Sequence, residues 1–383
     1  MKKLIIGGRD AFFSWGYRHL LKPLFFLMDP EKIHDRMVRT GRLLGGFAPG
    51  RWLIKAMFYS SSPMLSQKVA GLRFDSPVGL AAGFDKNAEL SAVLPFLGFG
   101  FAEYGSVTGE PCEGNAKPRL WRLKRSQGLL VYYGLKNDGA EVLAKRMGRE
   151  FPRQRCWKLA RHFVNGVSVA KTNCAETVDC TKGVMDYAKA YREVRPYADY
   201  ITVNISCPNA FGGQPFTDRK SLDLLLKELD QLYQEGRPVF IKMSPDLQVS
   251  EIDDILEVCS KHRVDGYVCS NLTKKRENHK IVEKDFPEVG GISGKVVQHL
   301  ADDLIRHVYL KTGGKKAIIG VGGIFSAEDA YEKIKNGASL VQLITGMIFQ
   351  GPSLISEINL GLERLLKKDG YKHVSEAVGV NLK

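Results

Sequence analysis

The strongest constraint on the fold is that eight short β-rich segments alternate with helical patterns from about residue 66 onward. Helical patterns such as Ser221–Glu235, Val249–Lys261 and Ala327–Asn336 separate most of them. Eight such units predict an α/β fold, a closed parallel (β/α)8 TIM barrel, with an open doubly wound sheet as the alternative. The even number of strands favours the barrel. The expected strands are Val78–Ala82, Phe101–Gly105, Gly166–Ala170, Ile201–Ser206, Val239–Met243, Gly266–Ser270, Ala317–Val321 and Leu340–Ile344.

The first 65 residues have a different pattern and predict a small helical N-terminal extension. Asp29-Pro30-Glu31 predicts an N-cap followed by proline at the first helical position. Residues 60–63, Ser-Ser-Ser-Pro, indicate a linker, so we expect an extension over 1–65 and a barrel domain over 66–383. The expected helices are Ala11–Met28, Pro30–Leu44 and Trp52–Tyr59.

The chain has a net charge of +14, and residues 1–60 carry eleven Lys and Arg against four Asp and Glu. In the first helix, aromatic and leucine side chains alternate with Arg18, His19 and Lys22, the mixture typical of a helix at a membrane surface. Nucleic acid binding, a solvated surface without a partner, and packing of the helices against the barrel are the alternatives. We expect a peripheral contact with a membrane surface.

The seven cysteines form no CxxC pair and no cluster with metal-ligand spacing, so we expect no metal site and a reducing compartment. The N-terminal apolar run stops at Gly7, Gly8 and Arg9, too early for the core of a signal peptide. No run of about 18 uncharged apolar residues predicts a transmembrane span. We therefore expect neither a signal peptide nor a membrane-spanning helix.

Glycines follow the last two expected strands, in GVGGI (320–324) and ITGM (344–347). TIM barrels bind phosphate between the loops after strands seven and eight, on backbone N–H groups that side chains would obstruct. These segments therefore predict a phosphate site at Gly322, Gly323, Thr345 and Gly346, with ordinary turn glycines as the alternative.

Lys86 and Lys242 lie at strand ends that should face the barrel mouth. A buried ammonium group needs an anionic partner, and the negatively charged N1–C2=O edge of a reduced flavin is one. The alternative is that each lysine turns out to solvent. Asp85, beside Lys86, is assigned no role because it can cap the loop.

The loop after the fourth strand, NISCPN (204–209), places Cys207 between Asn204 and Asn209. Asparagine offers both a donor and an acceptor to the amides and carboxylate of a substrate. A cysteine can remove a proton as thiolate or return it as thiol. The alternative for Cys207 is a buried structural thiol. Asn271 adds a third amide after the sixth strand.

Seven segments in order along the chain resemble the dihydroorotate dehydrogenases, and specifically their class 2, quinone-dependent branch. The N-terminal MDPEKIH stretch also resembles class 2, in which the extension docks on a membrane and forms a quinone tunnel. The segments are LAAGFDKNAE (80–89), EYGSVTGEPCEGNAKPRLWRL (103–123), VNISCPN (203–209), IKMSPDL (241–247), GGISG (290–294), IIGVGGI (318–324) and GASLVQLITG (337–346).

The resemblance implies that Cys207 removes a proton from dihydroorotate while the neighbouring carbon gives a hydride to FMN, which then reduces a quinone. It implies substrate contacts from Lys86, Asn204, Asn209 and Asn271. It further implies a place in de novo pyrimidine biosynthesis, peripherally on the cytoplasmic side of an inner or mitochondrial inner membrane, with no nucleic acid partner. The implied FMN contacts are Ala82, Gly83, Lys86, Ser106, Ser168, Asn204, Lys242, Ser270, Gly294, Gly322, Gly323, Thr345 and Gly346.

Three positions depart from the class 2 pattern. Cys207 stands where class 2 has serine, which is a class 1 feature. Val131 stands where the family has an asparagine that binds the substrate. An apolar side chain cannot make the two hydrogen bonds that this asparagine would make. Ser168 stands where class 2 has an asparagine near the flavin. An FMN enzyme acting on a different cyclic substrate is therefore the first alternative.

Two further alternatives stay open. Dihydrouridine synthases are also FMN barrels with a cysteine that donates a proton, and a basic chain could bind tRNA. However, those enzymes carry a helical domain after the barrel, whereas the extra helices here come before it. A non-catalytic barrel that binds a partner through these helices is the last alternative.

Overall fold

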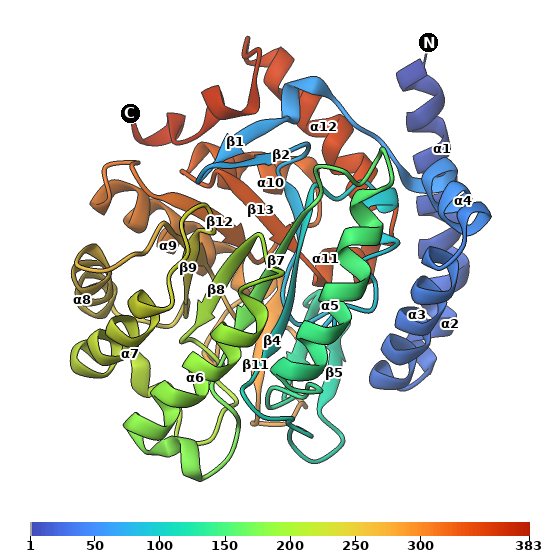
Figure 1. Ribbon diagram of the computed structural model, residues 1–383. Coiled ribbons are helices and arrows are strands. Elements are labelled where there is room, and N and C mark those ends of the chain that lie inside the picture. The colour runs from blue at the N-terminus through green and yellow to red at the C-terminus, as the bar shows by residue number, and fades with distance from the viewer. Residues whose placement is uncertain (1) are drawn as a thin grey trace.

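The computed structural model describes residues 2–383. Eight parallel strands close into a barrel in the order β10-β12-β13-β3-β4-β7-β8-β9, which confirms the predicted fold (Figure 1). All eight expected strands are present, with ends that differ from the prediction by two residues at most. The strands are β3 (Val78–Leu80), β4 (Phe101–Val107), β7 (Val164–Val169), β8 (Tyr200–Asn204), β9 (Val239–Met243), β10 (Gly266–Cys269), β12 (Ala317–Val321) and β13 (Leu340–Leu343).

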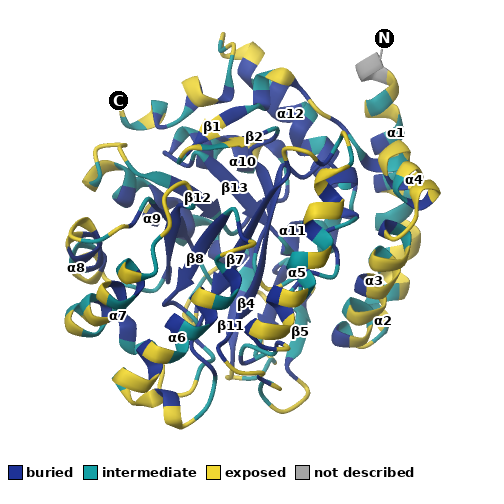
Figure 2. Cartoon of the chain, viewed as in Figure 1, coloured by how far each residue is buried: buried dark blue, intermediate teal, exposed yellow. Residues whose placement is uncertain are grey.

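Helices cover the outside of the barrel, and Figure 2 shows them buried toward the strands and exposed on their outer faces. The predicted Ser221–Glu235 helix begins two residues earlier, because Asp218 accepts hydrogen bonds from the backbone N–H groups of Lys220 and Ser221. The helices are α5 (Ala140–Arg155), α6 (Cys180–Val194), α7 (Arg219–Gln231), α8 (Val249–Ser260), α9 (Gln298–Lys311), α10 (Ala327–Lys335), α11 (Thr345–Gln350) and α12 (Leu354–Lys368).

The N-terminal helices lie along one side of the barrel (Figure 1). They are α1 (Lys2–Gly16), a π-helical turn (Tyr17–Leu21), α2 (Lys22–Leu27), α3 (Pro30–Gly45) and α4 (Ala48–Phe58). The predicted cap is confirmed, since the Asp29 carboxylate accepts a hydrogen bond of 2.8 Å from the backbone N–H of Lys32.

The start of the first helix was predicted wrongly, because it begins at Lys2 and not at Ala11. Gly7 and Gly8 therefore lie inside α1, although glycine lowers helix stability. Tertiary contacts with α12 outweigh that cost: Asp10 is buried, and its carboxylate accepts a hydrogen bond of 2.6 Å from the Ser356 hydroxyl.

Two small antiparallel sheets were not predicted. A hairpin of β1 (Gln67–Val69) and β2 (Leu72–Phe74) closes one end of the barrel, where the Phe74 and Phe101 rings lie 5.2 Å apart. A three-stranded sheet pairs β6 (Gly128–Val131) with both β5 (Leu120–Leu123) and β11 (Gly291–Gly294). Val131 and Gly294 of this sheet line the main cavity, so the sheet forms part of the wall of the barrel mouth.

The barrel interior changes from apolar to polar along the strands. Phe101, Tyr200, Phe240 and Leu340 belong to one apolar cluster at the closed end. Because side chains two positions apart on a strand share a face, the next inward residues are Glu103, Thr202, Lys242 and Gln342. These four polar residues are all buried, and Lys242 and Gln342 also line the cavity.

Candidate active site

A cavity opens at the carboxyl ends of the barrel strands, with about 1300 Å³ of empty space when its open mouth is included. Its wall brings together fifteen of the sixteen residues that the sequence predicted for the site. They are Ala82, Gly83, Lys86, Ser106, Asn204, Cys207, Asn209, Lys242, Ser270, Asn271, Gly294, Gly322, Gly323, Thr345 and Gly346.

Ser168 is the predicted residue that does not line this cavity. It is fully buried on β7, and its hydroxyl oxygen lies 2.7 Å from that of Ser106. Ser106 in turn accepts a hydrogen bond of 2.8 Å from the Asn204 side chain. Ser168 can therefore influence the cavity through Ser106 and not by its own contact.

The loop after β12 is shaped by glycine. Gly322 and Gly323 have φ angles of +115° and +77°, which favour glycine. A Cβ atom on Gly323 would lie 2.3 Å from the Cβ of Gln298. No residue of the described chain accepts a hydrogen bond from the backbone N–H groups of these two glycines, so both groups are available to an anion.

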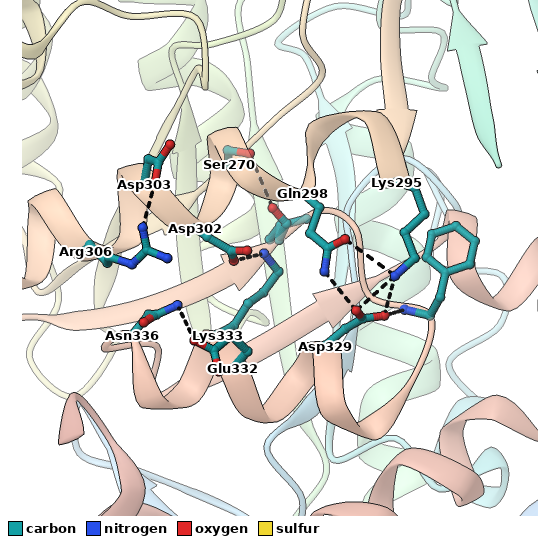
Figure 3. Close-up of polar contacts among 12 residues, drawn as sticks. Ser270, Lys295, Gln298, Asp302, Asp303, Arg306, Asp329, Glu332, Lys333 and Asn336 are labelled. Atoms are coloured by element: carbon teal, nitrogen blue, oxygen red, sulfur yellow. Dashed lines mark hydrogen bonds and ion pairs between the residues drawn. The ribbon is translucent and has the colours of Figure 1, made fainter. Parts of the chain in front are cut away.

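Polar contacts behind this loop fix its position (Figure 3). Asp329 at the start of α10 accepts hydrogen bonds from the Lys295 ammonium at 2.7 Å and from the Phe325 backbone N–H at 2.8 Å. Burial favours the neutral acid, but Lys295 holds the pKa of Asp329 below its usual value. In the same view, the fully buried Lys333 donates to Asp302 at 2.6 Å. These contacts join α9, α10 and the glycine loop.

Lys86 faces the cavity without a carboxylate partner. Its Nζ lies 3.4 Å from the centre of the Tyr133 ring, and no ion pair to it occurs in residues 2–383. Burial, together with the nearby Lys136 ammonium, lowers the pKa of Lys86 to about 7. An anion bound in the cavity would stabilise the charged form of Lys86.

The loop after β8 places Cys207 between two differently bonded asparagines. Asn204 is satisfied within the protein, because its carbonyl oxygen accepts from Ser206 and its amide donates to Ser106. Asn209 donates to the Val131 carbonyl at 2.8 Å, and its own carbonyl oxygen is buried with no partner in the described chain. Burial raises the pKa of the Cys207 thiol. The free Asn209 acceptor is suited to an N–H group of a substrate.

The cavity has an apolar end that reaches the N-terminal helices. Leu120, Leu129, Val131 and Ile348 line it, and they belong to a cluster with Phe26 of α2 and with Phe325 and Phe349. The Val131 side chain thus lines the cavity as part of an apolar wall, at the position where the sequence resemblance has a substrate-binding asparagine.

Three titratable residues of the cavity wall, His34, Tyr133 and Lys136, were not predicted. Burial and the nearby Lys86 ammonium lower the pKa of His34 to about 4, so the imidazole is neutral at pH 7. The only sequence signals were the position of His34 in MDPEKIH and of the other two in the segment that contains Val131. Neither signal shows that α3 reaches the barrel mouth.

A buried ion pair joins α3 to the barrel beside these residues. Arg119 and Glu31 make two hydrogen bonds, of 2.8 and 3.2 Å, and Lys117 and Lys136 each lie 3.6 Å from the same carboxylate. Burial opposes ionisation, but the Arg119 hydrogen bonds and the three positive charges hold the pKa of Glu31 at about 2.

Within residues 2–383, His, Cys, Asp and Glu form no group of three or more that could hold a metal ion. In the same residues, no helix combines the length and the apolar character needed to cross a bilayer.

Comparisons with known proteins agree on one family. The family model described as dihydroorotate dehydrogenase matches residues 64–366. Two similar curated proteins are both named dihydroorotate dehydrogenase (quinone). The one from Haloarcula marismortui is 40% identical and covers 95% of this chain and 99% of its own. The one from Crocosphaera subtropica is 38% identical and covers 92% of this chain and 94% of its own.

Solved structures of dihydroorotate dehydrogenase from Eimeria tenella are similar in fold and sequence. The ligand-free structure has a TM-score of 0.82 at 31% identity and covers 93% of this chain and all of its own. The complex of that enzyme with ferulenol has a TM-score of 0.81 at 31% identity, covering 92% of this chain and 96% of its own.

Proposed function

Because this chain belongs to the dihydroorotate dehydrogenase family, we propose that it oxidises dihydroorotate to orotate in de novo pyrimidine biosynthesis and passes the electrons to a quinone. The observation that carries the proposal is one continuous cavity with two ends of different chemistry. Cys207, Lys86 and the three asparagines form a polar end, and Leu120, Leu129 and Ile348 form an apolar end. A polar acid and a hydrophobic quinone can each find matching surroundings.

FMN is the flavin that this site fits. Glycine is required at positions 323 and 346, because a Cβ atom there would lie 2.3 Å from Gln298 Cβ or 2.0 Å from the Ile324 carbonyl oxygen, so both loops pack closely against their neighbours. The unbonded N–H groups of the glycine loop suit the FMN phosphate, and the buried Lys242 suits an electron-rich ring edge. The residues proposed to hold FMN are Ala82, Gly83, Lys86, Ser106, Asn204, Lys242, Ser270, Gly294, Gly322, Gly323, Thr345 and Gly346, with Ser168 acting through Ser106.

Cys207 is proposed as the base. When bound, FMN supplies the chemistry of accepting a hydride from dihydroorotate and giving electrons to the quinone. Lys86 binds and orients the carboxylate of the substrate, and the Asn209 carbonyl oxygen accepts from a ring N–H. The Cys207 Sγ then takes the proton from the carbon next to the one that loses hydride. Since burial raises the pKa of Cys207, the thiolate needs nearby positive charge, and the Lys242 and Lys171 ammonium groups provide it.

The first experiment is anaerobic reduction of the purified protein by dihydroorotate, followed at the flavin absorbance band. Rapid bleaching supports the assignment and means that Val131 is compatible with this substrate. If dithionite bleaches the flavin but dihydroorotate does not, the flavin assignment stands and the substrate assignment is refuted. The alternative of an FMN enzyme that acts on a different cyclic substrate would then replace it. Protein without a flavin band would refute the cofactor.

Residues 1–65 are proposed as the part that admits the quinone and contacts a membrane surface from one side. Twelve of the 22 exposed large hydrophobic side chains of the described chain lie in residues 5–53, beside the basic residues of the same region. Leu27 is 83% exposed and Trp52 is 70% exposed, and neither contributes to the core. Apolar side chains mixed with positive charge favour an anionic membrane surface. This location corresponds to the cytoplasmic side of an inner membrane, or to a mitochondrial inner membrane.

Co-sedimentation with anionic vesicles tests the membrane proposal. The double substitution Leu27→Gln and Trp52→Gln should weaken vesicle binding at least tenfold. A matched control replaces Val249 and Leu310, which are 61% and 59% exposed on the barrel helices, with glutamine. Equal binding by both double variants would contradict a membrane contact through the N-terminal helices.

A further inference from the structure

One carboxylate inside the barrel takes no part in the proposed reaction. Glu103 lies on β4 between two apolar neighbours in sequence and has no exposed surface. It follows Phe101, which belongs to the apolar cluster at the closed end of the barrel, by two positions. Its side chain therefore points into the barrel, toward the floor of the cavity. A buried carboxylate is costly unless it is well bonded or paired with a cation.

The two oxygens of Glu103 have different surroundings. Oε2 accepts hydrogen bonds from the Tyr200 hydroxyl at 3.1 Å, the Thr202 hydroxyl at 3.0 Å and the Gln342 amide at 3.2 Å. Oε1 is buried and has no partner in the described chain. All three donors are neutral, so hydrogen bonds alone leave the charge of Glu103 without compensation.

Lys242 is the cation that faces this carboxylate. It lies on β9, two positions after Phe240 of the same apolar cluster, and it is 4% exposed. Its ammonium group makes no ion pair within residues 2–383, although Glu103 and Cys207 both favour its charged form. The Gln342 amide donates to Glu103, and Gln342 lines the cavity, as Lys242 does.

Glu103 thus lies beneath the cavity, and Lys242 and Gln342 belong to the cavity wall above it. Glu103 and Lys242 are oppositely charged and buried in one low-dielectric region, although they are not in direct contact as an ion pair. Such charges interact over several ångströms because water does not screen them. The field of Glu103 therefore reaches both Lys242 and the cavity floor.

We propose that Glu103 is a positioning residue whose negative charge sets the reduction potential of the flavin bound above it. The proposal rests on the proposed function in one respect, namely that a flavin occupies the cavity. A negative charge under the floor opposes the arrival of electrons in the cavity, whereas Lys242 favours it. Glu103 offsets part of the Lys242 charge and holds the potential below the value that Lys242 alone would produce.

The test is the midpoint potential of the flavin in the purified, loaded protein, measured spectroelectrochemically at the same pH for every variant. Glu103→Gln removes the charge and keeps the shape. We expect the reduced form to gain at least tenfold over the oxidised form, which for a two-electron couple is a positive shift of about 30 mV or more.

The matched control is Thr202→Val, which removes one hydrogen bond from the same buried layer and leaves every charge in place. We expect its potential to equal that of the unsubstituted protein. An unchanged potential in Glu103→Gln, or equal shifts in both variants, would overturn the proposal. If the Gln variant does not fold, Glu103→Asp replaces it, because it moves the charge back by one carbon. A positive but smaller shift is then expected, and no shift overturns the proposal.

Flavin binding and the potential of Glu103→Gln separate the proposed function from the role of Glu103. If the unsubstituted protein binds no flavin, the proposed function is wrong. If it binds flavin and Glu103→Gln leaves the potential unchanged, only the role of Glu103 is wrong.

Discussion

Replacing Glu31 with glutamine should weaken the attachment of α3 to the barrel by about 3 kcal/mol. Glu31 and Arg119 are 7% and 5% exposed, and the two hydrogen bonds between them join residues that are 88 positions apart. Removing one partner of a buried ion pair typically costs about 3–5 kcal/mol, because the other charge stays buried. The substitution leaves Arg119 in this position.

The pKa of Glu31 gives a second, independent value for the free energy that this ion pair contributes. Its fall from 4.5 to about 2 corresponds to roughly 3 kcal/mol of stability, at about 1.4 kcal/mol per pH unit. A lowered carboxyl pKa stabilises the folded state above the unfolded pKa, so this contribution is complete above about pH 4.5. It is lost as the pH falls toward 2. The stability of the α3 attachment should therefore differ between Glu31→Gln and the unsubstituted protein at neutral pH, and it should converge near pH 2.

Hydrogen exchange of the α3 amides measures this local attachment. A loss of about 3 kcal/mol increases the opening equilibrium by about two orders of magnitude, so exchange in α3 should accelerate about 100-fold while the barrel strands keep their rates. Asp35→Asn is the matched control, since Asp35 is exposed on the same helix. If Glu31→Gln and Asp35→Asn exchange at the same rate, the ion pair does not attach the helix, and the reasoning is refuted.

Three further predictions concern the site. Cys207→Ala should lower turnover about 10²- to 10⁴-fold and Cys207→Ser should keep part of it with a shifted pH profile, so a fully active alanine variant would exclude Cys207 as the base. Binding of the anionic substrate should weaken as the pH rises through about 7, where Lys86 loses its charge, and Lys86→Met should remove that dependence; a titration of Lys86→Met that keeps the dependence would contradict this. Gly323→Ala should lower flavin affinity at least tenfold because its Cβ would lie 2.3 Å from Gln298 Cβ; a flavin titration that gives an unchanged affinity would contradict this.

The strands and most of the site could be predicted from the sequence. Parallel barrel strands are buried on both faces, so each is a short apolar run that is visible locally. Because the carboxyl ends of all eight strands meet at one mouth, polar residues after separate runs, such as Lys86, Cys207 and Asn271, could be placed together from their sequence positions. The Asp29 cap was equally local, since it depends on residues within one helical turn.

Other features depend on pairing between distant segments. The sheet at the barrel mouth joins Val131 to Gly291, 160 positions later, and no local pattern specifies that register. The start of α1 at Lys2 depends on contacts with α12, which outweigh the low helix propensity of Gly7 and Gly8.

The sequence by itself determined which segments become strands and which end of each strand carries the chemistry, because periodicity and burial act over a few residues. The tertiary structure alone decided which charges face one another. Glu31 meets Arg119, and Glu103 lies under the cavity with Lys242, only after the barrel has closed and excluded water from both places. Burial of this kind gives these charges their effect, and it arises only from the packing of the whole chain.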